Sequence, residues 1–366
     1  MRKIIIAALL LAALQTNAQL TTVPDGDNKR ATVSEGIGIT NITINYSRPG
    51  VKGREGKIWG GIVHYGFADL GFGTSKAAPW RAGANENTTI EFSTLVKVEG
   101  QELPAGKYGF FIAVQPEECT LIFSKNSGSW GSFFYKQDED ALRVKVKPQQ
   151  LSNSVEWLQY TFENETPASA TIALSWEKWK IPFKIDVDVT TTQLASFRQE
   201  LRSDKGFTWM AFQQAANYCL TSNTNLEEGL TWARAAVGAP FIGQPNFATL
   251  STEAGLLRKL GQDAAADSAM QKAVPMGDMV QLHNYARQLL QQHQAKQAFS
   301  IFKMNYDKNP DVFTTNMGMA RGYSATGNYK EALKYAQKAL TQAPDPGNKT
   351  NVEGLVGKLK AGQDIN

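Results

Sequence analysis

Histidine and cysteine are scarce in this sequence of 366 residues, which contains three histidines and two cysteines. Neither an HExxH pattern nor a Cys/His spacing typical of zinc is present, so we predict no metal site. Cys119 lies in an expected strand and Cys219 in an expected helix. Because two isolated cysteines do not make a disulfide framework, we interpret both as small buried apolar side chains.

Several motifs that would indicate a catalytic activity or a bound cofactor are also missing. The sequence has no GxSxG elbow, no GxxxxGK[ST] phosphate loop and no GxGxxG after a strand, so we predict no cofactor. The formal net charge is only +4, and no cluster of Lys and Arg is interleaved with aromatic residues. This balance excludes a nucleic-acid partner.

The first eighteen residues, MRKIIIAALLLAALQTNA, have the build of a secretory signal peptide. Two basic residues precede an apolar run over residues 4–14, which is too short to span a bilayer. Thr16 and Ala18 are small enough to precede a cleavage site, so the mature chain is expected to begin at Gln19. Since no later segment is apolar for eighteen residues, we expect an exported protein, periplasmic or secreted, with no membrane span after cleavage.

The sequence alternates with period two over residues 36–190. Nine segments of strand length are rich in β-branched and aromatic residues and are separated by Gly, Pro, Asn or Asp. No helix-length pattern lies between them. This arrangement predicts an antiparallel β-sandwich of jelly-roll-like type, preceded by an N-terminal extension at residues 19–35.

The period changes to that of helices over residues 191–348, and the pattern repeats. Similar small, aromatic and proline positions recur 34 residues apart, which is the tetratricopeptide period. About four units are expected, followed by a C-terminal helix or tail at residues 349–366. The positions that carry this resemblance are Ala286, Ala298, Ala320, Tyr323, Gly327, Tyr329, Ala332, Ala336, Ala339 and Pro344. Stacked helical hairpins present a surface for a protein or peptide partner; the alternative is that the array packs on its own β domain.

Two segments of the β half, YSRPGVKGR and WRAGANEN, gather its most polar side chains. The candidate site residues are Arg48, Lys52, Arg54, Trp80, Arg81, Asn85 and Glu86. Arginine forks suit carboxylates, phosphates and backbone carbonyls, and asparagine offers a donor and an acceptor together. Two interpretations remain open. The cluster binds a small anionic or sugar-like ligand, or it is a structural latch that bonds the backbone of long loops.

No catalytic residue is predicted, and we favour a non-enzymatic binding function. The alternative is a carbohydrate-active or other hydrolase, in which Glu86 acts with a second carboxylate of the β domain. The latch hypothesis predicts that Glu86 pairs with Arg81 or Arg48. The hydrolase hypothesis predicts another carboxylate at about 5–10 Å from Glu86 in an open pocket.

The segments INYSRPGVKGREGKIWGGIVHYG, PWRAGANENTTIEFS, LPAGKYGFF and ALRVKV occur in an order that resembles the signature of the DUF2911 family. This exported bacterial family is common in Bacteroidetes. The resemblance covers about residues 20–188 and implies a β-sandwich-like domain behind a signal peptide, in some members with a tetratricopeptide tail. It implies no reaction. This chain departs from the family pattern by the thirteen residues FADLGFGTSKAAP, which stand before Trp80.

Overall fold

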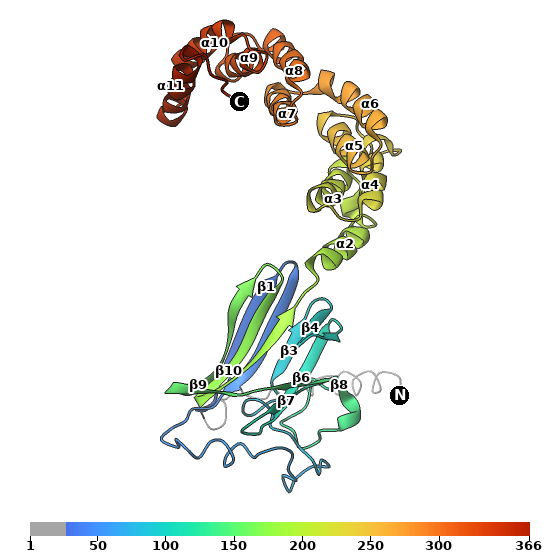
Figure 1. The fold of residues 1–366 in the computed structure, drawn as a ribbon. Helices are drawn as coiled ribbons and strands as arrows, with labels where there is room; N and C mark the ends of the chain where they lie inside the picture. Colours follow the sequence, from blue (N-terminus) through green and yellow to red (C-terminus); the bar gives the residue numbers. More distant parts are fainter. Residues whose placement is uncertain (1–26) are drawn as a thin grey trace, which may run out of the picture. The chain divides into compact units, whose positions relative to one another are not determined.

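The computed structural model describes residues 27–366, and the chain divides into two compact units between Ala195 and Ser196 (Figure 1). The first unit contains strands and the second contains helices. The predicted signal peptide lies outside the described residues, as does the first part of the predicted N-terminal extension.

The first unit contains two antiparallel sheets, of six and four strands, within the described residues. In spatial order the larger sheet comprises β1 (Lys29–Ile37), β2 (Thr40–Arg48), β3 (Thr89–Phe92), β6 (Gly106–Ala113), β7 (Cys119–Ser124) and β8 (Asp140–Val146). The smaller sheet comprises β5 (Gln101–Leu103), β4 (Val96–Val98), β10 (Ser169–Asp186) and β9 (Gln149–Thr166).

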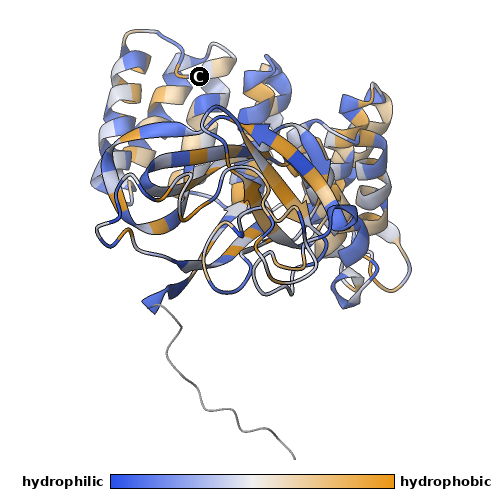
Figure 2. Ribbon diagram, turned by 90° about the horizontal axis from the view of Figure 1, so that it is seen from below, coloured by the Kyte–Doolittle hydropathy of each residue, from blue (hydrophilic) through white to orange (hydrophobic). Residues whose placement is uncertain are grey.

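The core of this unit lies between the two sheets. Buried apolar residues from strands of both sheets form one cluster, and Figure 2 shows apolar segments along the strands. The ring of Phe110, on the larger sheet, lies 5.6 Å from that of Phe183 on the smaller sheet and 5.1 Å from that of Phe123. The predicted antiparallel β-sandwich is therefore confirmed.

Two strands differ from the sequence prediction. β1 begins at Lys29, inside the segment that was predicted to be an extension, and its residues alternate between half-buried and exposed. An edge strand with so few apolar residues gives a weak periodic signal. Two of the segments predicted as strands, at residues 170–179 and 180–189, form the single strand β10 over most of their length. Glu177 has a φ of 50° and the pairing with β9 shifts at this residue, so a bulge interrupts the alternation.

The second unit is a row of helical hairpins. Helix α2 (Val189–Glu200) spans the division between the units. The hairpins pair α3 (Trp209–Ser222) with α4 (Leu226–Gly238), α5 (Phe247–Lys259) with α6 (Asp263–Ala273), α7 (Met279–Gln291) with α8 (Ala295–Lys308), and α9 (Phe313–Ala325) with α10 (Tyr329–Thr341). Helix α11 (Pro346–Lys360) packs on α10 and closes the row. Short 3₁₀ turns occur at Gln137–Glu139, Asp204–Gly206 and Val274–Met276.

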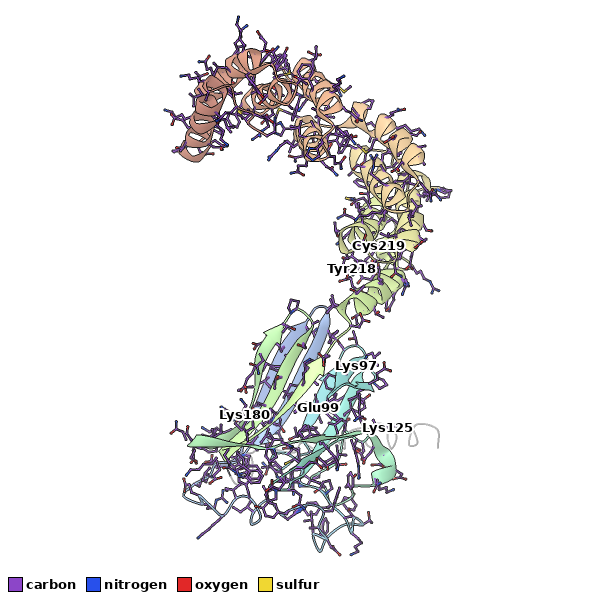
Figure 3. The ribbon with its side chains drawn as sticks, in the orientation of Figure 1. Lys97, Glu99, Lys125, Lys180, Tyr218 and Cys219 are labelled. Atoms are coloured by element: carbon purple, nitrogen blue, oxygen red, sulfur yellow. The ribbon has the colours of Figure 1, made fainter. Side chains whose placement is uncertain are left out.

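The same small position recurs in every hairpin. The fourth residue of each second helix is Gly229, Ala266, Ala298 or Ala332, and the three alanines are fully buried. A Cβ atom at Gly229 would lie 2.6 Å from the Cβ atom of Cys219, which Figure 3 labels on α3, so only a hydrogen fits there. These positions let paired helices approach closely. The predicted tetratricopeptide-like array is confirmed.

The predicted repeat positions serve the packing of these hairpins. Ala286 and Ala320 are each the eighth residue of a first helix and are fully buried. Gly327 has a φ of 80° in the turn between α9 and α10, a conformation that favours glycine. Pro344 lies between α10 and α11, where a proline stops the preceding helix.

His283 on α7 is a half-buried titratable group of the helical unit. Burial, together with the nearby charges of Arg287 and Arg321, lowers the pKa of its imidazole to about 4. Its Nδ1 atom has no hydrogen-bond partner among residues 27–366. Its ring lies 5.4 Å from that of Phe302, and burial with two nearby cations favours the neutral imidazole in the folded state.

We expect the helical unit to lose about 2 kcal/mol of unfolding free energy between pH 7 and pH 5 through His283. The pKa in the folded state lies below the unfolded value of about 6.5, so on acidification the unfolded chain takes up a proton that the folded chain refuses. Urea unfolding followed by circular dichroism at 222 nm measures this loss. His283→Gln should remove most of this difference, and an equal difference in both proteins would contradict the account.

Candidate functional site

Two predicted site arginines bond backbone carbonyls. Arg48, at the end of β2, donates from Nε to the carbonyl oxygen of Leu158 on β9 at 2.8 Å. Arg54 donates to the carbonyl oxygens of Val51 (2.9 Å) and Gly50 (2.6 Å) and so fixes the turn that follows β2. Both arginines therefore act on the scaffold, as a latch would.

Arg81 is differently placed. Its Nη1 atom donates to the carbonyl oxygen of Asn85 at 2.7 Å, and its guanidinium lies 5.2 Å from the centre of the Phe133 ring. Burial lowers the pKa of this guanidinium. Within the part of the chain that the structure describes, it has no ion pair with a carboxylate. Burying a cation without a counter-ion is costly.

Glu86 pairs with neither Arg81 nor Arg48. It forms an ion pair with Arg30 of β1 and accepts a hydrogen bond from Ser47 Oγ at 3.2 Å. Burial would raise the pKa of Glu86, but its own backbone N–H and these two partners hold it below the usual value. The hollow beside it measures 300 Å³, and its described lining contains no second carboxylate. The structure thus differs from both hypotheses drawn from the sequence. The partner of Glu86 was missed because the sequence analysis did not recognise β1, which carries Arg30, as a strand.

Other carboxylates of the β unit also have fixed partners. Lys180 and Glu99, which Figure 3 labels, line a hollow of 500 Å³ on the β unit. Lys180 forms an ion pair with Glu163, and Glu99 accepts a hydrogen bond from the backbone N–H of Lys184 at 2.5 Å. These carboxylates are engaged in holding neighbouring strands together.

Trp80 belongs to a cluster of four tryptophans. Trp59 stacks on Trp179 at 4.9 Å and meets Trp80 edge-on at 5.7 Å, while Trp80 and Trp176 stack at 6.2 Å. Trp80 Nε1 donates to the carbonyl oxygen of Gly83 at 3.1 Å. These rings therefore contact each other, and the cluster anchors the loop to the core.

The two polar segments line one pocket of 430 Å³. Its cationic residues are Lys52, Arg54 and Arg81, its amides include Asn85, and Trp176 forms part of its wall. None of the described lining residues is acidic. The structure therefore brings together most of the predicted site residues, while Arg48 and Glu86 lie outside this lining.

Backbone geometry explains how WRAGANEN reaches this pocket. Ala82 and Asn85 have φ values of 51° and 56°, so the segment turns sharply twice. Gly83 lies between them, and a Cβ atom there would stand 2.7 Å from Thr88 Oγ1. Thr88 donates to the carbonyl oxygen of Ala82 at 3.0 Å, which closes the turn just before β3 begins.

The helical unit contains a second candidate surface, a groove of 710 Å³ lined mainly by the first helices α3, α5 and α7. We call it the amide groove, because carboxamide side chains of the following residues line it: Asn217, Gln281, Asn284, Gln288, Gln292, Gln294 and Gln297. Its apolar wall includes Leu220, Phe247 and Tyr285. The ring of Phe247 lies 6.4 Å from that of Tyr285.

The sequence prediction missed the amide groove. The predicted repeat positions pack helix against helix and do not line it. The signal that was available is the spacing of Asn284, Gln288 and Gln292, which recur every four residues along α7 and its C-terminal cap.

Comparisons with known proteins agree with the division into two units. The family model described as protein of unknown function (DUF2911) matches residues 28–185, which confirms the resemblance of the β half. No curated protein matches the sequence of the chain. Within residues 27–366, no helix is long and apolar enough to cross a membrane, and no group of acidic, histidine or cysteine side chains is arranged to hold a metal ion.

The chain is also similar to solved structures, of which two are described as TPR proteins. The crystal structure of YrrB, a TPR protein with an unusual peptide-binding site, is 15% identical over 45% of this chain and 84% of its own, with a TM-score of 0.32. TTC0263 of Thermus thermophilus, a thermophilic TPR protein, is 15% identical over 47% and 90%, with a TM-score of 0.33. The APC/C hetero-tetramer Cut9–Hcn1 is 12% identical over 46% and 33%, with a TM-score of 0.33.

We expect Arg48→Met to lower the unfolding free energy of the β unit by about 1.5 kcal/mol, since it removes a charge-assisted bond to Leu158 O between two strands. Denaturant unfolding followed by tryptophan fluorescence measures the change. Arg30→Met is the matched control, because the Arg30 side chain is 71% exposed and its ion pair should contribute under about 0.5 kcal/mol. Equal losses in the two variants would contradict the role of Arg48.

Proposed function

We propose that this protein is a non-enzymatic interaction scaffold, and that its helical unit binds an extended, uncharged peptide segment in the amide groove. The observation that carries the proposal is the set of exposed carboxamides in this groove. The side chains of Asn217, Asn284, Gln288 and Gln292 are exposed, and none of them has a hydrogen-bond partner among the described residues.

Carboxamides suit the backbone of a bound peptide. Each offers two N–H donors and one carbonyl acceptor on a single planar group, the same chemistry that an extended chain presents with its N–H and C=O groups. Asn284 and Gln288 lie one helical turn apart on α7, and Gln292 caps its C-terminal end. Such a row binds a backbone without requiring a particular sequence.

The rest of the lining favours a neutral, partly apolar segment. Leu220, Phe247 and Tyr285 provide an apolar wall for side chains of the peptide. The cationic side chain of Arg258 is neutralised by Asp267 at 2.7 Å, which leaves Lys259 as an unbalanced charge at the groove. The groove therefore has too little net charge to attract a strongly acidic or strongly basic peptide.

A random peptide library displayed on phage and selected on the full chain tests the proposal. We expect enriched peptides to be rich in apolar residues, to bind with micromolar dissociation constants, and to lose at least tenfold in affinity for the double variant Asn284→Ala/Gln288→Ala. Fluorescence anisotropy with labelled peptides measures these constants.

The matched control is Gln271→Ala/Gln337→Ala. These two glutamines are exposed on the second helices α6 and α10, outside the groove lining. The control should bind as the unmodified chain does. Peptides whose affinity falls equally in both double variants, or in neither, would contradict binding in the amide groove.

We also propose that this scaffold is exported, on the support of the apolar segment at residues 4–14. Expression of the full chain in a bacterial host should yield an extracytoplasmic protein whose mass corresponds to a chain beginning at Gln19. Intact-mass spectrometry of the fractionated protein measures this. A product that retains Met1 and stays in the cytoplasm would contradict export.

A further inference from the structure

The pocket of 430 Å³ in the β unit takes no part in the function proposed for the helical unit. We call it the Arg81 pocket, and it is lined by residues of the two polar segments together with Ile62, Val63 and Trp176. We propose that the Arg81 pocket binds a small organic carboxylate whose body is apolar, such as an aryl or alkyl acid.

The charge of the pocket calls for an anion. Arg54 and Arg81 both line it, and no described lining residue is acidic. Lys52 stands at the rim, with its Nζ atom 3.6 Å from the carboxylate of Asp27 and its side chain 42% exposed. The two arginines are less exposed and have no ion pair among the described residues, so no described carboxylate cancels their charge.

Arg81 has donors available for a ligand. A guanidinium carries five N–H donors in a planar fork, and Arg81 uses Nη1 for the carbonyl of Asn85. Phe133 covers one face of the guanidinium, at 5.2 Å, and a Cβ atom at Gly131 would lie 2.8 Å from Arg81 Cζ. The loop around Gly131 therefore fixes the orientation of the fork, which lowers the entropic cost of binding a carboxylate.

A second donor in this wall is unsatisfied. Trp176 is 1% exposed, and its Nε1 atom has no hydrogen-bond partner among residues 27–366. Trp80, which stacks on it at 6.2 Å, donates to Gly83 and needs no further partner. A buried indole N–H without an acceptor costs about 1–3 kcal/mol, and a carboxylate oxygen would supply the acceptor.

The remaining wall accounts for the apolar body of the ligand. Trp80, Trp176, Ile62 and Val63 line the pocket beside the arginines, and Ile62, at 50% exposed, contributes most of the apolar surface. A bare inorganic anion would leave this surface uncovered, whereas an aromatic or aliphatic acid would bury it as its carboxylate meets Arg81. The volume of 430 Å³ falls within the range usual for small-molecule sites.

Four probes separate the contribution of the ligand's negative charge from that of its apolar group. Benzoate is a free acid, and N-acetylphenylalanine presents the carboxylate as the end of a peptide does. Benzamide has the same aromatic ring as benzoate but no charge. Inorganic phosphate is charged but has no apolar group. We expect saturable binding of benzoate or N-acetylphenylalanine to the full chain by isothermal titration calorimetry, at least tenfold tighter than that of benzamide or phosphate. Tighter binding of benzoate would identify the ligand as a free acid. Tighter binding of N-acetylphenylalanine would identify it as the C-terminal carboxylate of a peptide chain.

Variants locate the site. Arg81→Gln and Trp176→Phe should each weaken the binding of the preferred acid, Arg81→Gln by at least tenfold. Lys57→Gln removes an exposed cation of the same loop that does not line the pocket, and it should bind as the unmodified chain does. Circular dichroism melting shows which variants fold. If Arg81→Gln does not fold, Trp176→Phe and the exposed rim variant Lys52→Gln carry the test.

Three results would overturn the proposal. They are benzamide or phosphate binding as tightly as the acids, no saturable binding of either acid below about 10 mM, or folded pocket variants that bind the acid as well as Lys57→Gln does. Because Asn284→Ala/Gln288→Ala changes only the helical unit, it should leave acid binding intact. The peptide scaffold and the Arg81 pocket can therefore fail independently.

Discussion

The β unit depends on satisfying the backbone of one long connection. Residues 49–88 join β2 to β3 without forming a strand or a helix of their own. A folded connection of this length must find partners for its N–H and C=O groups outside any regular ladder. Neighbouring elements provide them: Val51 N donates to Glu156 O at 2.8 Å, and Trp80 exchanges two backbone bonds with Ile112 on β6 at 3.0 and 2.8 Å.

Side chains complete this network, and they explain the polar composition of the loop. Arg54 bonds two of its carbonyls, and the carboxylates of Glu156 and Glu177 accept from the N–H groups of Lys52 (2.9 Å) and Gly56 (3.2 Å). The tryptophan cluster fixes the same connection to the core. Arg81 differs from these residues, because it is half-buried with a single carbonyl partner and no counter-ion in the described part of the chain. A loop held by these contacts would keep the Arg81 fork in place for the carboxylate that we propose.

The features that follow from local periodicity could be predicted from the sequence. Those that depend on residues far apart in the sequence could not. The change from period two to helical period located both units, and the 34-residue spacing located the hairpins, because each hairpin repeats the same close contact at Gly229, Ala266, Ala298 and Ala332. The partner of Glu86 was missed, since Arg30 lies on an edge strand with few apolar residues. The amide groove was missed for another reason. Its side chains are exposed, so helix packing does not require them to recur at regular positions in the sequence.

Hydrogen exchange of the full chain, read by mass spectrometry, tests the central claim that the β2–β3 connection is a fixed part of the β unit. The account predicts that the backbone N–H groups of Val51, Gly66 and Trp80, which donate to Glu156, Val114 and Ile112, exchange as slowly as those of β6. Exchange of residues 49–88 at the rate of an unstructured peptide, while β6 stays protected, would contradict it.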